Sequence, residues 1–328
     1  MKAIVLTKYG SADVLKLEEV EKPTPKDNQV SIQVHATSVN DWDWCLMRGT
    51  PFYIRLLCGL LKPKIQIPGV EIAGRVEMVG KNVTKFKPGD AVYGDISECG
   101  FGGFAEYVCV PENALTLKPD SMTFVEAAAI PHAAILALQG LQDEGKIQPG
   151  QNLLINGAGG GVGTLGVQIA KSMGVVEVSG VDRSSKFEMM RSVGFDRTID
   201  YTQEDFTAQD RRYDLILDTK TNRSIFKYLR VLNPNGAYIT VGGSTPQLFQ
   251  ALLLGPIIRK FSQKNVSLVN LKPNKNLNYI NELFKSGKVK PVIDGPYKLS
   301  EVPDAIQYFG AGKHQGKVVI TLQEDNKT

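Results

Sequence analysis

Histidine and cysteine are scarce in this chain, and their scarcity limits the metal chemistry that the sequence can support. Among 328 residues there are only three histidines and four cysteines: His35, His132, His314, Cys45, Cys58, Cys99 and Cys109. The cysteines form no CxxC pair and follow no regular spacing, so no tetrahedral zinc site can be assembled from them and the histidines. We therefore expect no bound metal, and four free thiols in a reducing compartment.

Long apolar runs and an excess of charge of one sign are missing as well. No apolar stretch reaches the ~18–20 residues that a membrane-spanning helix needs, and the apolar run before Lys8 is too short for a signal peptide. The net charge of +4 comes without a block dense in lysine or arginine, so no nucleic-acid partner is expected. With 42% hydrophobic and 22% charged residues, the composition predicts a cytoplasmic globular protein long enough for two domains.

Residues 1–122 have the pattern of a β domain. Apolar or alternating segments predict strands at 3–6, 15–20, 30–34, 72–79, 91–93 and 105–110. Glycine and proline residues separate these segments as turns. Short strands with this punctuation indicate a compact, barrel-like domain.

Residues 123–265 alternate between helix and strand patterns. Thr123, followed three residues later by Glu126, predicts a capping box at the start of a helix that Pro131 interrupts. Strands are then expected at 152–156, 175–181, 198–199, 215–218, 237–241 and 267–269, and helices at 163–173, 185–193, from 203, 224–232 and 247–261. Six strands joined by helices predict a doubly wound parallel sheet.

Residues 266–328 are too few for a hydrophobic core of their own. Beyond the last strand of the sheet, the pattern predicts a helix at 277–285, another near 305–309 and a strand at 316–322. This segment is therefore expected to pack back on the N-terminal domain.

A glycine-rich turn follows the first strand of the predicted parallel sheet and precedes a helix. This layout places a pyrophosphate on backbone N–H groups at a helix N-terminus, and glycine lets the backbone approach the phosphates. The dinucleotide-binding fingerprint has Ala158, Gly160 and Gly163 at its three main places, while a second register, Gly161, Gly163 and Gly166, also fits. A plain loop is the alternative interpretation.

Seven short motifs in a fixed order carry a family resemblance. They are Val39-Asn40-x-x-Asp43-Trp44, Pro68-Gly69-x-Glu71-x-Ala73-Gly74, Lys87-Pro88-Gly89-Asp90-x-Val92, Gly103-x-Ala105-Glu106-Tyr107, Ala127-Ala128-Ala129-x-Pro131, Gly157-Ala158-x-Gly160-Gly161-Val162-Gly163 and Gly316-Lys317-Val318-Val319. With these motifs the chain resembles the zinc-free quinone oxidoreductase (zeta-crystallin-like) branch of the medium-chain dehydrogenase/reductase superfamily. The resemblance implies a GroES-like N-terminal domain, a six-stranded Rossmann domain, a chain end that returns to the first domain, and a homodimer.

The resemblance also implies an NAD(P)H-dependent, zinc-independent reductase of quinones or α,β-unsaturated carbonyls, with a small lipophilic acceptor bound between the domains. Where zinc dehydrogenases of the superfamily supply ligands, this chain reads Val39-Asn40-Asp41 and Gly69-Val70-Glu71. Alcohol oxidation needs a Lewis acid to hold an alkoxide, whereas a quinone or enone accepts hydride directly. The alternatives are a non-catalytic NADPH-binding sensor or RNA-associated protein, and an alcohol dehydrogenase-like enzyme.

Three residues are candidates for the catalytic site. The resemblance places Asn40 beside the nicotinamide and the substrate, where its amide can donate to the negative charge developing on oxygen. Asp43 either shares this site or anchors the same loop. His132 either relays a proton or is a structural residue. Cys45 stands where many relatives have tyrosine, which leaves the proton donor unidentified.

The end of the second Rossmann strand bears on the choice between NAD and NADP. Asp182 is placed to bind the ribose 2′-hydroxyl of NAD, whereas Arg183 and Lys186 are cations able to hold the 2′-phosphate of NADP. Lys186 and Tyr201 also match residues that zinc-free relatives use to hold this phosphate. We expect NADP(H), with NAD as the alternative. Other expected coenzyme contacts are Gly161, Val162 and Gly242.

Two apolar segments with basic residues at their edges remain, 52–67 and 251–264. Core packing is one interpretation of each segment. The other is a wall for a lipophilic acceptor, or weak contact with a membrane surface.

Overall fold

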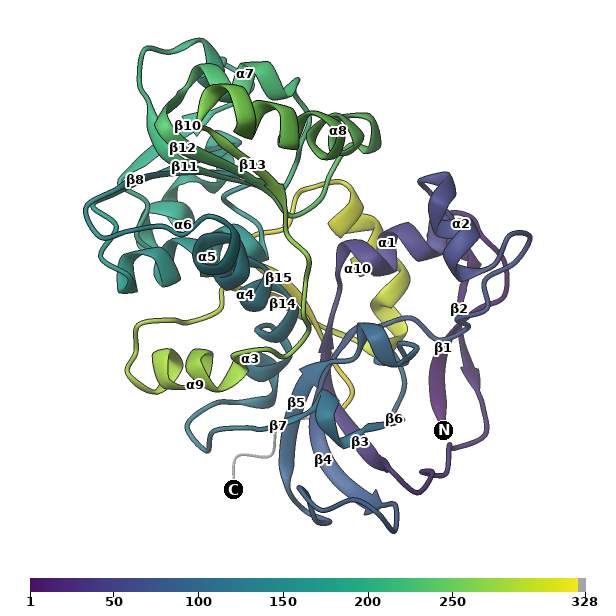
Figure 1. The fold of residues 1–328 in the computed structure, drawn as a ribbon. Coiled ribbons are helices and arrows are strands. Elements are labelled where there is room, and N and C mark those ends of the chain that lie inside the picture. The colour runs from purple at the N-terminus through teal and green to yellow at the C-terminus, as the bar shows by residue number, and fades with distance from the viewer. Residues whose placement is uncertain (324–328) are drawn as a thin grey trace. The chain divides into compact units, whose positions relative to one another are not determined.

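Two compact units make up the computed structural model, which describes residues 1–323 (Figure 1). Unit 1 combines residues 1–132, residues 273–285 and the described chain from Ile293. Unit 2 combines residues 133–272 and residues 286–292. The predicted domain limits, after residues 122 and 265, lie several residues earlier in the chain than the limits of these units.

Unit 1 is built on strands that come from both ends of the chain. They are β1 (Lys2–Leu6), β2 (Leu15–Glu19), β3 (Gln29–Ser38), β4 (Glu71–Val79), β5 (Ala91–Asp95), β6 (Tyr107–Pro111), β7 (Thr116–Leu117), β14 (Ile293–Lys298) and β15 (Lys317–Thr321). The larger sheet has the order β14-β15-β3-β4-β5-β7, and β6 also pairs with β3, while β1 and β2 form a separate ribbon. Because β15 pairs antiparallel with β3, the end of the described chain joins the N-terminal sheet.

The described part of unit 1 also contains α-helices. These are α1 (Asp41–Arg48), α2 (Phe52–Cys58), α3 (Phe124–Ala128), α9 (Leu277–Lys285) and α10 (Val302–Gly310). One core lies between the strands and includes Ile32 and Ile72. A second core joins α1, α2 and α10 through Leu46, Ile54 and Ile306. Helix α3 packs on β3 and β4, which is why unit 1 extends beyond its predicted limit.

Unit 2 contains a parallel six-stranded sheet. Its strands are β8 (Asn152–Asn156), β9 (Glu177–Asp182), β10 (Arg197–Asp200), β11 (Tyr213–Asp218), β12 (Leu232–Thr240) and β13 (Asn265–Leu268). The order β10-β9-β8-β11-β12-β13 reverses between β8 and β11, and each neighbouring pair is parallel. This is the order of a Rossmann sheet, which binds dinucleotides at the carboxyl edge where the order reverses. The predicted doubly wound sheet is confirmed.

Helices cover both faces of the parallel sheet. They are α4 (Pro131–Leu138, continued by a π-helical segment at Gln139–Glu144), α5 (Gly161–Ser172), α6 (Phe187–Ser192), α7 (Ile225–Arg230) and α8 (Thr245–Ser262). In β8, Leu154 belongs to the cluster formed with α7 and α8, whereas Ile155 lies beside Gly166 of α5. Burial on two faces explains why these strands read as uninterrupted apolar runs in the sequence.

The helix predicted from residue 203 is wrong. This segment contains only a short 3₁₀ turn at Phe206–Ala208. Asp200 and Asp205 each accept a hydrogen bond from the backbone N–H two residues further on, at 2.9 and 3.1 Å. Such local side-chain bonds offer the backbone an alternative to the helix.

Candidate active site

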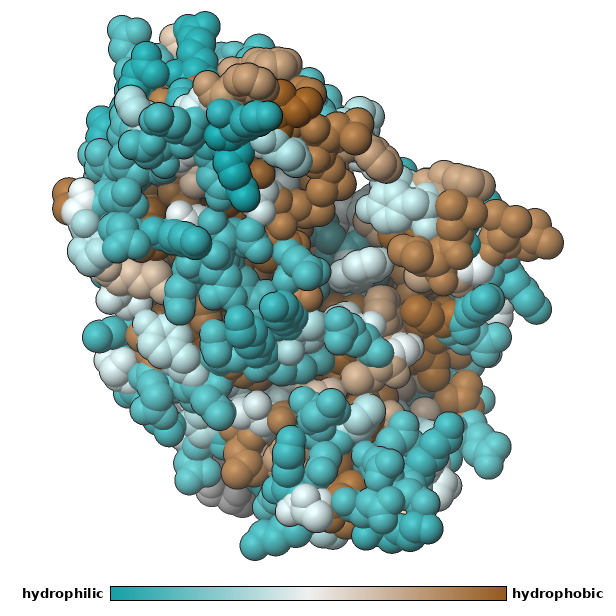
Figure 2. Space-filling view, in the orientation of Figure 1, coloured by the Kyte–Doolittle hydropathy of each residue, from teal (hydrophilic) through white to brown (hydrophobic). Residues whose placement is uncertain are grey.

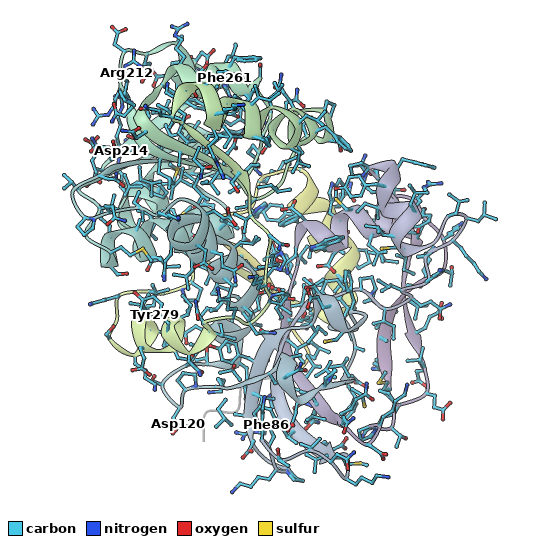
Figure 3. All side chains as sticks on the ribbon, in the orientation of Figure 1. Phe86, Asp120, Arg212, Asp214, Phe261 and Tyr279 are labelled. Carbon is cyan, nitrogen blue, oxygen red and sulfur yellow. The ribbon has the colours of Figure 1, made fainter. Side chains whose placement is uncertain are left out.

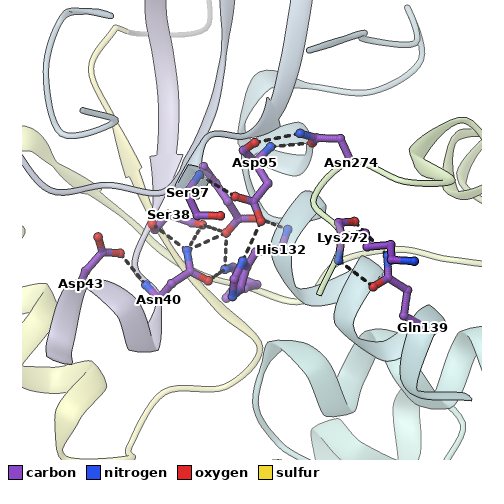
Figure 4. A network of polar contacts seen from close by, with 11 residues as sticks. Ser38, Asn40, Asp43, Asp95, Ser97, His132, Gln139, Lys272 and Asn274 are labelled. Atoms are coloured by element: carbon purple, nitrogen blue, oxygen red, sulfur yellow. Dashed lines mark hydrogen bonds and ion pairs between the residues drawn. The ribbon is translucent and has the colours of Figure 1, made fainter. Parts of the chain in front are cut away.

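A buried polar cluster in unit 1 is centred on the carboxylate of Glu71, which is fully buried. Its Oε2 accepts hydrogen bonds from Ser38 Oγ at 2.6 Å, from Asn40 Nδ2 at 2.7 Å and from Lys317 Nζ at 2.5 Å. Its Oε1 accepts the backbone N–H of His132 at 2.6 Å. Figure 4 shows three of the partner residues, Ser38, Asn40 and His132, close together in one network of dashed contacts. Four donors on one carboxylate satisfy a charge that would otherwise be costly to bury.

Strand pairing brings these residues together. Ser38 ends β3, Asn40 is the N-cap residue of α1, Glu71 begins β4 and Lys317 begins β15. Because β3 pairs antiparallel with both β4 and β15, its end lies beside the starts of these two strands. Residues far apart in the sequence therefore share one edge of the sheet.

Asn40 has its side-chain amide held in one orientation. Its Oδ1 accepts from Lys317 Nζ at 2.6 Å, and its Nδ2 donates to Glu71 Oε2 at 2.7 Å and to the Ser38 carbonyl at 3.2 Å. Both hydrogens of the amide therefore have acceptors in the protein. Donation by Asn40 to a substrate oxygen, as predicted, requires one of these bonds to be exchanged. The Lys317 ammonium has three hydrogens and binds Asn40 Oδ1 and Glu71 Oε2 within the described residues.

Asp43 lies next to this cluster but binds only the backbone in the contacts that the structure shows. Its Oδ2 accepts the N–H of Asn40 at 2.9 Å and its Oδ1 accepts the N–H of Gly69 at 2.7 Å. Complete burial raises the pKa of Asp43 to about 7, although these two bonds and the nearby Lys317 act in the opposite direction. The geometry favours the loop-anchoring alternative, and a catalytic role for Asp43 stays a prediction.

His132 forms a buried ion pair with Asp95. The His132 Nδ1 lies 2.7 Å from Asp95 Oδ2, and the two residues are 7% and 2% exposed. Burial disfavours charge on both groups, but their mutual hydrogen bond outweighs it. The pKa of Asp95 therefore lies below its ordinary value and the pKa of His132 lies above its own. With Nδ1 directed to the carboxylate, Nε2 is the nitrogen left to hold or release a proton.

Sequence reasoning placed Glu71 and Lys317 in family motifs without giving them a role, and it missed Asp95. Each of the first two is a charged residue that heads an apolar strand, and such a residue must find a partner if the strand is buried. The sequence therefore contained a signal for Glu71 and Lys317. It contained no signal for Asp95, because the position of Asp95 opposite Glu71 depends on the register of β4 with β5.

The residues of this cluster do not fit a zinc ion. Within residues 1–323 there is no group of three or more histidine, cysteine, aspartate or glutamate side chains arranged to hold a metal. An ammonium group, Lys317 Nζ, and the amide of Asn40 fill the space beside Glu71. A cation there would be repelled by the ammonium group of Lys317.

The glycine turn of unit 2 has the geometry of a phosphate site. β8 ends at Asn156, Gly157 has φ +83°, and α5 begins at Gly161 after the N-cap residue Gly160. Among the described residues no side chain caps this N-terminus, which leaves its first N–H groups for an anion. A Cβ at Gly163 would lie 2.4 Å from the Ala158 carbonyl oxygen, so this position requires glycine for close packing.

The predicted coenzyme residues at the end of β9 lie close together. Asp182 accepts the N–H of Gly159 at 2.9 Å, which ties the turn to β9. Lys186 is buried with its Nζ 3.6 Å from Asp182, and burial lowers its pKa. Arg183 is exposed and donates from Nε to the Tyr201 hydroxyl at 2.8 Å. Of the three predicted phosphate-binding groups, Lys186 therefore pairs with Asp182, and Arg183 is bonded to Tyr201.

Two further groups were missed by sequence reasoning. Lys220 has its side chain against the glycine turn, since a Cβ at Gly157 would lie 3.0 Å from Lys220 Cε. At the ends of β11 and β12, Asp218 accepts the N–H groups of Lys220 and Thr221, and Thr221 Oγ1 donates to the Gly242 carbonyl at 2.5 Å. This network fixes the backbone around Gly242 at the carboxyl edge, where the coenzyme is expected.

Removing the ammonium group of the buried cluster is expected to destabilise the protein strongly. Lys317→Met leaves the carboxylate of Glu71 buried without its charged partner, which lowers the free energy of unfolding by about 3–5 kcal/mol. Lys285→Met is the matched control, because its pair with Glu282 is exposed and contributes at most about 1 kcal/mol. Urea unfolding of both variants measures the difference, and equal losses would contradict the role given to Lys317.

The His132–Asp95 pair is expected to stabilise the protein within a defined pH window. The raised pKa of His132 gives stability that is complete below its unfolded value of about 6.5 and is lost as pH rises through the folded value. The lowered pKa of Asp95 gives stability that is complete above its unfolded value of about 3.9 and is lost as pH falls through the folded value. Urea unfolding of the wild type and His132→Gln should therefore differ most between about pH 4 and 6.5. A difference that does not change with pH would rule out the charged pair.

Comparison with known proteins agrees with both units. Residues 26–120 match the family described as alcohol dehydrogenase GroES-like domain, and residues 193–320 match the family described as zinc-binding dehydrogenase. The 2-methylene-furan-3-one reductase of Solanum lycopersicum is 36% identical over 98% of this chain and 79% of its own length. The chloroplastic NADPH-dependent alkenal/one oxidoreductase of Arabidopsis thaliana is 34% identical with the same coverage. The quinone oxidoreductase structure from Coxiella burnetii has a TM-score of 0.87 at 27% identity, covering 98% of this chain and 99% of that chain.

These matches extend over nearly the whole chain and include both the GroES-like sheet and the Rossmann sheet, as the seven motifs predict. The chain is therefore an oxidoreductase and belongs to the quinone oxidoreductase branch of the medium-chain dehydrogenase/reductase superfamily.

Proposed function

We propose that this protein reduces α,β-unsaturated carbonyls or quinones by hydride transfer from NADPH, without a metal. The observation that carries the proposal is the buried cluster of unit 1, in which the Lys317 ammonium group binds Asn40 and Glu71, within the two motifs where zinc dehydrogenases of the superfamily supply ligands. The names of two relatives, a 2-methylene-furan-3-one reductase and an alkenal/one oxidoreductase, support an enone as the acceptor. The relative from Coxiella burnetii supports a quinone.

The chemistry that the chain must supply is charge stabilisation and a proton. A bound nicotinamide supplies the hydride, which adds to an electron-poor carbon and leaves negative charge on the acceptor oxygen. Lys317 is held by Asn40 and Glu71, so its charge is positioned before any substrate binds. His132, ion-paired through Nδ1, can deliver a proton from Nε2, and its raised pKa keeps that proton available near neutral pH.

We propose NADP(H) rather than NAD(H) as the coenzyme. Asp182 already accepts the N–H groups of Gly159 and Arg183, so its capacity to accept a ribose 2′-hydroxyl is partly used. Arg183 is exposed and bonded to Tyr201, so it presents positive charge for a 2′-phosphate, while Lys186 pairs with Asp182 beside it. The name of the Arabidopsis thaliana relative also states NADPH dependence.

A homodimer and a cytoplasmic location stay predictions. Similar proteins include relatives named as chloroplastic and a homolog of a synaptic vesicle membrane protein, so the names of the relatives point to different compartments. The non-catalytic alternatives gain no support from these relatives, whose names describe reductases and oxidoreductases.

Activity on a mixed acceptor panel tests the proposed reaction. The purified protein is expected to consume NADPH with enones or quinones, and to show no reduction of NADP⁺ with simple alcohols, because alcohol oxidation needs a Lewis acid. Loss of NADPH absorbance measures both reactions. The proposal fails if NADPH binding does not saturate and no acceptor of the panel supports turnover.

Substitution of the exposed residue Arg183 tests the proposed preference for NADPH over NADH. Arg183→Gln is expected to weaken NADPH binding about 10- to 100-fold, because a hydrogen bond between two charged groups is lost, and to leave NADH binding unchanged. Titration calorimetry with each coenzyme measures both constants, and Lys288→Gln, at an exposed position of unit 2, is the control. Equal weakening of NADH would show that Arg183 does not hold the 2′-phosphate.

A further inference from the structure

Helix α8 of unit 2 presents a continuous apolar stripe to solvent. Phe249, Leu252, Leu253, Ile257 and Phe261 are between 52% and 79% exposed. Their spacing of three and four residues places them on one side of the helix. Figure 2 shows hydrophobic residues gathered over α8, and Figure 3 marks Phe261 near the end of this helix. Large exposed apolar patches of this kind mark interaction surfaces.

The opposite side of α8 is the side that packs in unit 2. Ala251, Gly255 and Ile258 are buried, and a Cβ at Gly255 would lie 2.9 Å from the Val266 carbonyl oxygen of β13. Core packing was one of the two interpretations of residues 251–264. It accounts only for the buried side of α8. The exposed stripe needs a different partner.

The chain around α8 carries charge of one sign. Between Asp218 and Lys272 the sequence contains no aspartate or glutamate, although the whole chain has 34 of them. The basic residues of this segment are Lys220, Arg223, Lys227, Arg230, Arg259, Lys260, Lys264 and Lys272. Arg259 and Lys260 lie in the last turn of α8, beside the end of the apolar stripe. Arg223 and Lys227 pair with Asp205, whereas the structure shows no ion pair for Arg259 or Lys260 within residues 1–323. The surface thus combines an apolar stripe with two unpaired cations at its end.

We propose that α8 docks on the surface of an anionic lipid bilayer, with the stripe at the boundary between headgroups and acyl chains. Helices that lie in this interface have an apolar face and a basic polar edge, and anionic lipids attract the basic residues. No helix within residues 1–323 has the length and apolar content to cross a bilayer.

A second copy of the chain matches this surface less well. A twofold interface uses the same patch of both copies, so the cations of this segment would face a patch whose own segment contains no carboxylate. Like charges brought together without counter-charges weaken an interface. An anionic membrane supplies the missing negative charge.

Vesicle flotation tests the proposal with the full chain. Wild-type protein is expected to float with vesicles of phosphatidylcholine mixed with phosphatidylserine, more weakly with phosphatidylcholine alone, and less as salt concentration rises. Leu253→Ser combined with Phe261→Ser should lower the partition coefficient more than about tenfold, because two large apolar groups no longer enter the interface. Lys260→Glu should lower it about fivefold or more on the mixed vesicles.

Matched variants keep the test specific. Val176→Ser and Lys288→Glu change an exposed apolar and an exposed basic residue elsewhere in unit 2, and should leave flotation unchanged. NADPH binding by every variant reports whether unit 2 is folded. The proposal is overturned if wild type does not float with the mixed vesicles, or if the α8 variants float as well as wild type. It is also overturned if the Leu253→Ser/Phe261→Ser change turns dimers into monomers in sedimentation without altering flotation.

A second apolar segment provides an internal comparison. In α2 and the residues after it, Phe52, Leu57 and Leu61 are 64%, 66% and 90% exposed. If Leu57→Ser with Leu61→Ser abolishes flotation while the α8 variant retains it, the membrane surface belongs to unit 1 and the assignment to α8 is wrong. If only the α8 variant loses flotation, the assignment stands.

Discussion

The ion pair of Glu71 and Lys317 is the constraint on which the polar chemistry of unit 1 depends. Both groups are buried, so removing either one leaves the other as an isolated charge in the interior. Glu71 also accepts from Ser38 and Asn40, and these bonds give each side chain one orientation. Donors held in this way favour the negative charge that hydride transfer leaves on an enone or quinone, with one present bond of Asn40 exchanged if its amide donates to that oxygen.

The proposed phosphate site of unit 2 is built from backbone N–H groups more than from charged side chains. The turn after β8 brings N–H groups to the start of α5, and Asp182 holds that turn by accepting the N–H of Gly159. In the proposed coenzyme site, glycine and helix direction account for phosphate binding. The proposal assigns the selection between NADP and NAD to side chains beside β9, above all Arg183. Phosphate binding and coenzyme selection thus use different groups at the same edge of the sheet.

The sequence was sufficient for the parallel sheet, the glycine turn and the return of the last strand, because burial on two faces and tight turns leave local patterns. Helices α1 and α2 and strand β14 were not predicted, and β14 contains Gly295-Pro296, which reads as a turn. The partners of Asn40 and His132 could not be predicted, since the contacts with Glu71, Lys317 and Asp95 depend on strand register. No local pattern records which residues face one another across β3, β4, β5 and β15.

Lys317 lies 246 positions after Glu71 and 277 after Asn40. During synthesis the first strands of unit 1 leave the ribosome long before β15, so Glu71 has no counter-charge from Lys317 until β15 has been made. A chain truncated before β15 has a buried carboxylate without its ammonium partner and an unpaired edge on β3. The same cluster thereby makes the fold of unit 1 depend on β15, so that chains lacking this strand are expected to be less stable and more open to proteolysis.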